Sequence, residues 1–176
     1  MTSRYEDARA DLAAWRDAYP SDPLAADGVL RSLIDADVTD ASRRAALLDE
    51  AGAFGRAVVE TIAPAARQYE QRGRGPELAR WDGIGRRVER VVFDGSYQVA
   101  GSAVWNSGLV AHSGTPGRAY EQATLLYLLS FEGEAGHACP AVCTIGLARA
   151  LRRRADDAVR NRFLPPLLER DARRAQ

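Results

Sequence analysis

The sequence predicts an all-α fold, a helical bundle, on three observations. Apolar residues recur at helical intervals through most of the chain. Proline, glycine and helix-capping residues mark the breaks between these segments. No long region shows the alternating or β-branched pattern of a strand-rich fold. The 176 residues are 46% hydrophobic and 27% charged, which is an ordinary globular composition, and a chain of this length encloses one hydrophobic core.

The first helix is expected over residues 2–18, followed by a break at two prolines. Its apolar side chains fall at roughly helical intervals, namely Tyr5, Leu12, Trp15 and Tyr19. Ser21 or Asp22 is the expected cap of a short helix that runs on to Ile34. We treat residues 1–20 as an N-terminal helix or extension, residues 21–171 as the folded domain and residues 172–176 as a tail.

A longer helix is expected from a capping signal at residues 39–42 to Ala66. Its apolar residues form one stripe with a spacing near 3.6, and these are Leu47, Leu48, Ala51, Phe54, Val58, Val59 and Ile62. Pro64, near the end of the stripe, is expected to kink or end the helix. Residues 70–94 differ, with turns at residues 72–76 and 81–85 and an extended stretch expected at residues 88–93.

The second half of the chain gives stronger helical signals. Residues 95–110 read as a helix weakened by Gly101 and Gly108. The signal strengthens from Ala119, and from Ala123 to Phe131 the side chains are apolar almost all round, which is typical of a buried helix. Pro140 suits the first turn of a further helix, and arginines near residue 152 suit its C-terminal end. A last short helix is capped at residues 156–157 and is expected to end at residues 165–166.

Charge composition excludes several classes of function. The 24 basic residues balance 24 acidic ones, which argues against a protein that coats nucleic acid or anionic lipid. All the basic residues are arginine, so mechanisms that need a lysine, such as Schiff-base chemistry or a P-loop, are excluded. The polar amino terminus lacks the apolar core of a secretory signal, and no apolar run reaches the length of a membrane span. We expect a cytoplasmic protein with reduced thiols and no membrane or nucleic-acid partner.

The richest cluster of reactive side chains lies between residues 132 and 144. A metal site could use His137, Cys139 and Cys143, but a structural zinc site normally has four ligands, usually as two separated pairs, and His112 is the only other histidine. The simpler interpretation is that the two thiols, four residues apart, share one helix face and pack as small hydrophobic groups.

Catalytic interpretations of the same segment are weaker. His137 and Cys139 lie two residues apart, which on a helix directs them to different faces, and a nucleophilic cysteine also needs an orienting third group. Glu132 and Glu134 could act as a pair of acid and base if buried, but two residues apart they do not face each other on a helix. We expect one of the two glutamates to be solvated and the other to cap a helix or to pair with arginine. Glu134 is the more interesting of the two, because it lies beside the glycine-rich break.

Two stretches, taken together, resemble a known family. One runs from Pro76 to Phe93 and is followed by an aromatic residue at Tyr97, and the other runs from Glu132 to Thr144 and is followed by residues 163–171. Their order and spacing resemble the N-terminal helical domain of acyl-CoA dehydrogenases, closest to the AidB-like branch. The resemblance extends over nearly the whole chain, from about residue 22 to residue 171, and its motifs are structural signatures more than catalytic ones.

The family pattern is altered at several positions. Pro76 stands where that branch has two prolines, Trp81 where it has tyrosine, and Cys143-Thr144 where it has Met-Thr. The resemblance implies that the segment from Glu134 to Thr144 lines one wall of an acyl-thioester pocket. The residues implied to face substrate or flavin are Glu134, His137, Cys139, Cys143 and Thr144. A histidine and a cysteine among them argue against a standard fatty-acyl substrate.

Family members continue into a β-barrel, which holds much of the flavin site, and a C-terminal four-helix bundle, which usually carries the catalytic base. The present sequence stops where the barrel would begin. We therefore expect an N-terminal subunit of a split acyl-CoA dehydrogenase-like flavoenzyme. It would bind FAD only with a partner chain that carries the barrel and bundle, and would act on an acyl thioester of coenzyme A or of a carrier protein. The alternative is a non-catalytic helical binding or regulatory module derived from the same fold.

Overall fold

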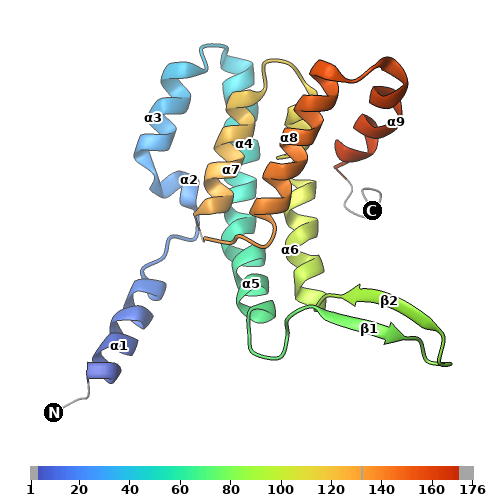
Figure 1. Cartoon of the computed structure of the whole chain (residues 1–176). Coiled ribbons are helices and arrows are strands. Elements are labelled where there is room, and N and C mark those ends of the chain that lie inside the picture. The colour runs from blue at the N-terminus through green and yellow to red at the C-terminus, as the bar shows by residue number, and fades with distance from the viewer. Residues whose placement is uncertain (1–3, 132, 171–176) are drawn as a thin grey trace.

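A computed structural model describes residues 4–131 and 133–170, and it shows a helical bundle with a β-hairpin projecting from one end (Figure 1). The all-α prediction therefore holds for the body of the domain. The elements follow in the order α1 (Arg4–Asp17), α2 (Pro23–Ala26), α3 (Gly28–Asp37), α4 (Ala41–Ala57), the π turn η1 (Val58–Ile62), α5 (Ala63–Tyr69), β1 (Glu77–Trp81), β2 (Arg87–Val92), α6 (Gly95–Asn106), the 3₁₀ turn η2 (Ala111–Gly114), α7 (Ala119–Ser130), α8 (Ala138–Arg154) and α9 (Asp157–Leu167).

Aspartates cap five of these helices. The carboxylates of Asp22, Asp27, Asp40 and Asp156 each accept the backbone N–H three residues further on, and Asp94 accepts the N–H of the second residue after it. Each such cap contributes about 0.5–2 kcal/mol to stability. The capping signals read from the sequence near residues 22, 40 and 156 are confirmed, with Asp22 rather than its serine neighbour as the first cap.

A π turn joins α4 to α5 in one long helical segment. The sequence left open whether Pro64 kinks or ends this segment, and it does not end it, because the helix continues to Tyr69. The π turn at Val58–Ile62 lies directly before Pro64, so the proline falls in the first turn of α5. Proline is tolerated there because an N–H in the first turn has no partner within the helix.

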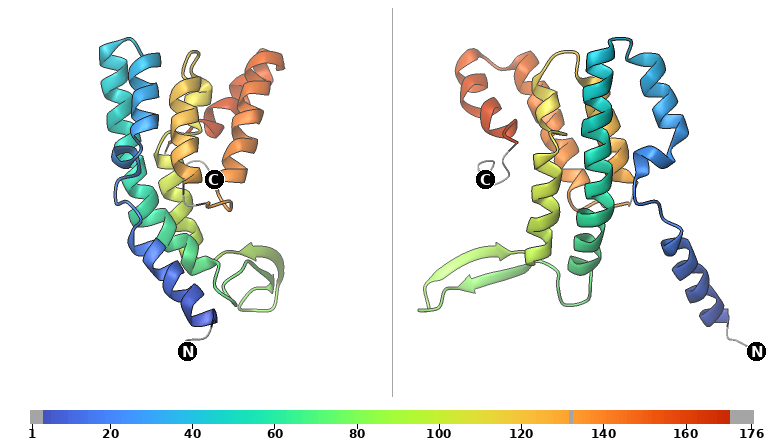
Figure 2. Two further views of the ribbon diagram at one scale, coloured as in Figure 1. Left: turned by 90° about the vertical axis from the view of Figure 1, so that its left-hand side faces the viewer. Right: turned by 180° about the vertical axis from the view of Figure 1, so that it is seen from behind.

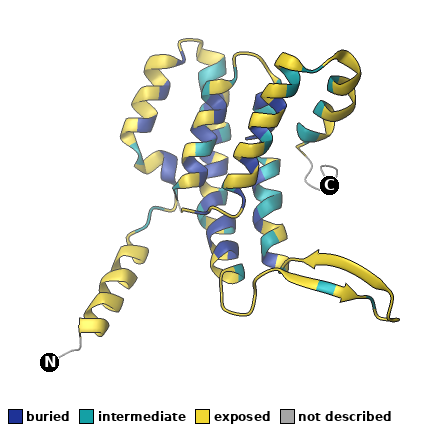
Figure 3. Cartoon of the chain, in the orientation of Figure 1, coloured by how far each residue is buried: buried dark blue, intermediate teal, exposed yellow. Residues whose placement is uncertain are grey.

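The core lies between α4, α6, α7 and α8, with α3 closing one side (Figures 1 and 3). Its largest fully buried apolar side chains are Ile34, Leu47, Val58, Ile62, Val104, Leu109, Val110, Leu125, Leu128 and Leu129. Six of them come from the apolar stripes predicted for the long central helix and for the helix from Ala119, namely Leu47, Val58 and Ile62 in the first and Leu125, Leu128 and Leu129 in the second. The second of these is not buried all round, however, because Ala123 and Tyr127 on its outer side are exposed.

One buried ion pair ties α4 to α7. Glu121 is 1% exposed, and its carboxylate receives two hydrogen bonds from Arg43, at 2.6 and 2.8 Å, and one from Arg118 at 2.7 Å. Burial alone would raise the pKa of Glu121, but the two guanidinium groups outweigh it and lower the pKa to about 2. The carboxylate therefore stays charged at neutral pH.

The hairpin is the departure from helical structure in the described chain. Strands β1 and β2 pair antiparallel, with Leu78 opposite Val91 and Trp81 opposite Arg87. The extended stretch predicted at residues 88–93 is confirmed, whereas its pairing with residues 77–81 was not predicted. The turn between them uses Gly85 at φ 84°, a conformation that glycine adopts without strain. Nearly all of the hairpin is exposed (Figure 3).

Helix α1 projects from the opposite flank of the domain, and every one of its residues is exposed (Figures 1 and 2). In residues 4–131 and 133–170, none of the helices has both the length and the apolar character needed to span a bilayer. The predicted tail, residues 172–176, lies outside the described residues.

Candidate functional site

The structure brings together two of the five predicted site residues, Glu134 and His137, in the segment that leads into α8. Tyr69 from the end of α5 and Tyr97 from the first turns of α6 complete the group. We call these four residues the Glu134 cluster. They lie at the end of the bundle from which the hairpin projects (Figure 1).

Glu134 is the centre of this cluster and is 4% exposed. Its Oε1 accepts a hydrogen bond from the Tyr69 hydroxyl at 2.5 Å, and its two oxygens accept the backbone N–H of His137 at 2.9 and 3.0 Å. The N–H of Ala138 follows at 3.3 Å. Burial raises the pKa of Glu134, but the hydrogen bonds from His137 and Tyr69 outweigh it, so the pKa lies below its ordinary value. Glu134 is thus an ionised cap on the N-terminus of α8, as predicted for one glutamate of the pair.

His137 fills the space between this carboxylate and α6. Its ring packs on Tyr97 with centroids 4.1 Å apart, and its Nδ1 lies 3.5 Å from Glu134 Oε1 without forming a hydrogen bond in the described structure. Its Nε2 faces Gly101, where a Cβ atom would come within 2.8 Å. Gly101, predicted to weaken α6, is therefore the position that admits the buried imidazole.

The two tyrosines were not predicted as site residues. Burial, followed by the neighbouring Glu134 carboxylate, raises the pKa of both Tyr69 and Tyr97. Tyr97 also stacks on Phe93 at 4.4 Å and donates a 3.2 Å hydrogen bond to the carbonyl of Gly136. In the sequence, Tyr97 drew attention only as an aromatic of the family pattern. Tyr69, 65 residues before its partner Glu134, gave no signal at all.

The remaining predicted site residues, Cys139, Cys143 and Thr144, lie on α8 outside the cluster. Both cysteines are free and exposed, so the prediction that they pack as small hydrophobic groups was wrong. The reason is the phase of the helix, whose buried face is formed by residues 141, 145 and 148. Thr144 is half-buried and donates its hydroxyl to the carbonyl of Pro140 at 2.8 Å.

The histidine and the thiols do not converge on one point. His137 is buried while Cys139 is exposed, as expected for residues two positions apart. His112 lies elsewhere, 2.8 Å from Glu50. Within the part of the chain that the structure describes, no group of three or more His, Cys, Asp or Glu side chains is placed to hold a metal ion. Glu132 lies outside the described residues.

The outer face of α8 carries no charge over its first three turns. From Ala138 to Ala148 the sequence contains no ionisable side chain except the two thiols. Two large apolar residues on this face, Val142 and Leu147, are 47% and 49% exposed. A helix face that contacts water normally carries charged or polar residues, so this face has the composition of a covered surface.

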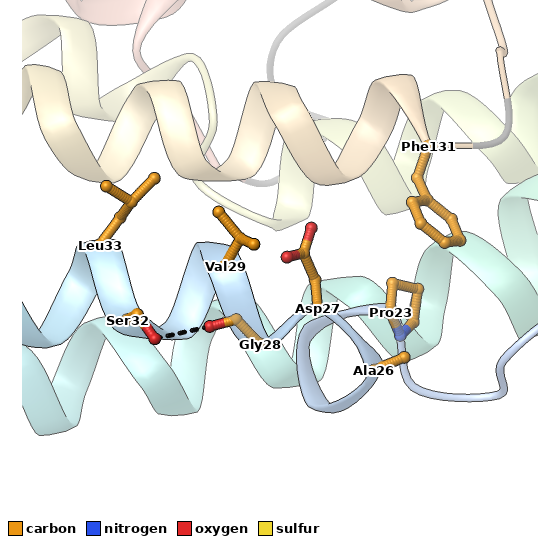
Figure 4. Close-up of a pocket in the computed structure, with 8 residues that line it drawn as sticks. All are labelled: Pro23, Ala26, Asp27, Gly28, Val29, Ser32, Leu33 and Phe131. Atoms are coloured by element: carbon orange, nitrogen blue, oxygen red, sulfur yellow. Dashed lines mark hydrogen bonds between the residues drawn. The ribbon is translucent and has the colours of Figure 1, made fainter.

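A second apolar surface lies between α3 and α7, on the other side of α7 from α8. Two adjoining cavities of about 770 and 570 Å³ share Asp27, Val29 and Leu33. Phe131 lies at one end of the larger cavity (Figure 4), and Tyr127 of α7 lines the smaller one. We call this surface the α3–α7 groove. Asp27 is the only charged side chain among its described lining residues, and it accepts a 2.6 Å hydrogen bond from the Tyr127 hydroxyl.

The helical bundle is the fold that the resemblance to the N-terminal helical domain of acyl-CoA dehydrogenases led us to expect. The chain belongs to the family of the adaptive response protein AidB N-terminal domain, whose model matches residues 16–172. The solved structure of Bd2924 in its apo form is similar, with a TM-score of 0.74 and 26% identity over 88% of this chain. The match covers 31% of the Bd2924 chain. No curated protein matches the sequence.

Proposed function

We propose that this domain forms one wall of an acyl-thioester pocket in an acyl-CoA dehydrogenase-like flavoenzyme, in complex with a partner chain that carries the barrel and the C-terminal bundle. The observation that supports this most is the uncharged, exposed outer face of α8. An uncovered apolar surface of this kind marks an interface or a ligand-facing wall. The α8 face contains Cys139 and Cys143, two of the residues that the family resemblance assigns to the pocket.

The hairpin supports docking of a large partner. Its exposed apolar side chains are 40–75% accessible, and they are Leu78, Trp81, Ile84, Val88, Val91, Val92 and Phe93. An isolated two-stranded hairpin is marginally stable in water, because it buries little apolar surface. The hairpin and the outer face of α8 together give a partner two apolar surfaces to cover.

The chain's own residues would shape the pocket and exclude water from it. They would not transfer protons. The Glu134 cluster fixes the segment before α8 with hydrogen bonds to Tyr69, His137 and Ala138. These hydrogen bonds fix the position of the first turns of α8. A wall that is held rigidly in this way can orient a substrate. Because Glu134 is fully hydrogen-bonded and has a lowered pKa, we assign it to positioning and not to general-base catalysis.

The proposed reaction is α,β-dehydrogenation of an acyl thioester of coenzyme A or of a carrier protein. A carboxylate of the partner would remove the α-proton, and the β-hydrogen would leave as hydride while the carbon–carbon double bond forms. FAD would supply the hydride acceptor when bound in the complex. The uncharged face of α8 fits an apolar wall for such a site because it offers no charge that would hold water.

The test is co-expression of the chain with an acyl-CoA dehydrogenase-like partner from the same organism, followed by purification and visible spectroscopy. We expect a two-chain complex with a flavin band that bleaches on addition of an acyl thioester. Leu147→Glu on the outer face of α8 should abolish the complex, while Ala53→Glu, at an exposed position of α4, should leave it intact. If the chain is stable and colourless and does not bind the partner, the proposal is contradicted and a non-catalytic binding module is favoured.

A further inference from the structure

Three arginines in the last turns of α8 share one cavity. Arg149, Arg152 and Arg153 form one wall of this cavity, which has a volume of about 390 Å³. The facing wall comes from η2, the loop after it and the first turn of α7, at the end of the bundle away from the hairpin (Figure 1). We call this cavity the arginine pocket. Its volume lies in the range of small-molecule sites, about 300–1,000 Å³.

The helix dipole does not account for all three arginines. A cation is favourable near the C-terminus of a helix, but the effect falls off within the last turn. Helix α8 ends at Arg154, so Arg149 lies more than one turn before its end. Arg154 itself, which is best placed to interact with the dipole, is not among the residues that line the pocket. The gathering of the other three therefore needs a further explanation.

Two of the guanidinium groups are held in place by neutral acceptors. Arg149 donates a 2.6 Å hydrogen bond to the side-chain oxygen of Gln122, which is 3% exposed and whose own amide group donates to the carbonyl of Leu109. Arg152 donates at 2.7 Å to the carbonyl of Ser113, a buried residue. A guanidinium has several N–H donors, so both arginines keep donors for a further partner. Because the acceptors are neutral, they orient the two groups and leave their positive charge uncompensated.

The acidic residues that contact or adjoin the pocket wall are engaged elsewhere. Glu50 lies 2.8 Å from His112, which lines the pocket, and also pairs with Arg170. Glu121, beside the glutamine that holds Arg149, has two guanidinium partners of its own, as described above. No acidic side chain belongs to the part of the pocket wall that the structure describes.

The two aspartates that follow α8 are engaged as well. Asp156 caps α9, and Asp157 pairs with Arg160. In residues 4–131 and 133–170, none of the three pocket arginines forms an ion pair, and Arg153 forms no hydrogen bond. The positive charge of the pocket is therefore not neutralised within the described chain.

Uncompensated guanidinium groups in one cavity are the chemistry of a phosphate site. Arginine binds phosphate oxygens through paired, charge-assisted hydrogen bonds. Arg149 and Arg153 are four residues apart, so their side chains are neighbours on the same face of α8. A single phosphate group carries about 1.5–2 negative charges at pH 7, fewer than the positive charges of the three arginines. The pocket therefore matches a ligand with two adjacent phosphate groups better than a ligand with one.

We propose that the arginine pocket binds the diphosphate group of a small molecule, either free pyrophosphate or the diphosphate of a nucleotide. The proposal does not depend on the proposed function, because the uncharged outer face belongs to the first turns of α8 and the pocket to its last turns. The chain as a whole has no net charge, and its uncompensated arginines are gathered in a cavity. Both facts favour a small anion over a nucleic acid, which needs an extended basic surface.

Isothermal titration calorimetry of the full chain at low ionic strength tests this proposal, with inorganic pyrophosphate, inorganic phosphate and ADP as probes. We expect pyrophosphate to bind at least about tenfold more tightly than phosphate, since it offers more charge and more acceptor oxygens. Added salt should weaken the binding. Tighter binding of ADP than of pyrophosphate would identify the ligand as a nucleotide, and equal or weaker binding of ADP would identify the diphosphate alone. Absence of binding at millimolar pyrophosphate, or phosphate bound as tightly as pyrophosphate, would overturn the proposal.

Arg153→Gln is the most informative variant, because Arg153 lines the pocket without a hydrogen bond to the described chain and its loss should leave the fold intact. It should weaken pyrophosphate binding about tenfold or more, as the loss of a charge-assisted hydrogen bond does. Arg154→Gln is the matched control, since it removes the same charge from the next position of α8, outside the pocket, and should change the affinity less than about twofold. Equal weakening by both variants would show that the anion follows the general charge of the helix end, and would refute the site. Binding of duplex DNA without binding of pyrophosphate would refute it as well.

Discussion

Gly101→Ala tests the fit of the buried imidazole against α6. An added Cβ atom would lie 2.8 Å from His137 Nε2 and 3.1 Å from its Cδ2, closer than side chains normally approach. The ring cannot retreat freely, because Tyr97 packs on it at 4.1 Å and Gly101 is in the middle of α6. The substitution therefore has two opposing effects on stability. Alanine favours the helix more than glycine does, but its Cβ atom crowds the imidazole.

The magnitude follows from these two effects. Replacing a glycine inside a helix with alanine stabilises it by about 1 kcal/mol. Overpacking a well-filled site costs about 1–3 kcal/mol. Gly146→Ala is the matched control, because Gly146 lies inside α8 and an added Cβ meets nothing within 4 Å. Gly146→Ala should raise the free energy of unfolding. The free energy of unfolding of Gly101→Ala should lie about 1–3 kcal/mol below that of Gly146→Ala.

Urea unfolding followed by circular dichroism at 222 nm measures both free energies of unfolding. His137→Ala removes the imidazole, so adding Gly101→Ala to that variant should stabilise it as much as Gly146→Ala stabilises the wild type. The double-mutant cycle isolates the steric contact between the two residues. Equal stabilisation by Gly101→Ala and Gly146→Ala in the wild-type background would refute the account of the imidazole pocket.

Three further predictions concern charge, hydrogen bonding and exposure. Folding lowers the pKa of Glu121 from 4.5 to about 2, which corresponds to about 3 kcal/mol of stability. This contribution is present above pH 4.5 and is lost as the pH falls toward 2. The free energy of unfolding of Glu121→Gln should therefore depend less on pH in this range than that of the wild type. Tyr69→Phe should cost about 1.5–3 kcal/mol at pH 7 by removing a donor to the buried Glu134 carboxylate, and Tyr127→Phe, whose hydrogen bond to Asp27 lies at the surface, should cost less. The two cysteines of α8 should react with a thiol reagent in the folded chain without denaturant.

Each of these three has a clear contrary outcome. An acid-unfolding curve that is the same for wild type and Glu121→Gln would mean that the ion pair with Arg43 does not hold the carboxylate charged. A larger loss for Tyr127→Phe than for Tyr69→Phe would contradict the burial of the Glu134 cluster. If the thiols react only in denaturant, the two cysteines are buried in the folded chain and pack against other side chains.

Local features of this fold could be predicted from the sequence because their causes are local. The aspartate caps at residues 22, 40 and 156 act on N–H groups three residues away, so their position in the sequence suffices. The apolar stripe of α4 likewise follows from its spacing. The π turn within the same helical segment could not be predicted, because it leaves no distinct pattern in the residues before Pro64.

The candidate site was predicted only in part because its partners are distant. The segment around Glu134 stood out by its glycines and its family resemblance, and both Glu134 and His137 are indeed close together. Tyr69 and Gly101 join them only through the packing of α5 and α6, which a single sequence does not reveal. The burial of the two cysteines was misjudged because the phase of α8 is set by its contacts with the core.

The π turn at Val58–Ile62 has a further consequence for the tolerance of this fold to insertions and deletions. A π turn holds one residue more than the α-helical turn it replaces. Deleting one residue there would therefore restore a regular α-helix and leave the residues that follow facing nearly the same directions. Tyr69 should then keep its contact with Glu134, whereas a deletion in the regular part of α4 would rotate Tyr69 by about 100° and turn it away from Glu134. The π turn is thus the position in this helical segment at which the loss of one residue is best tolerated.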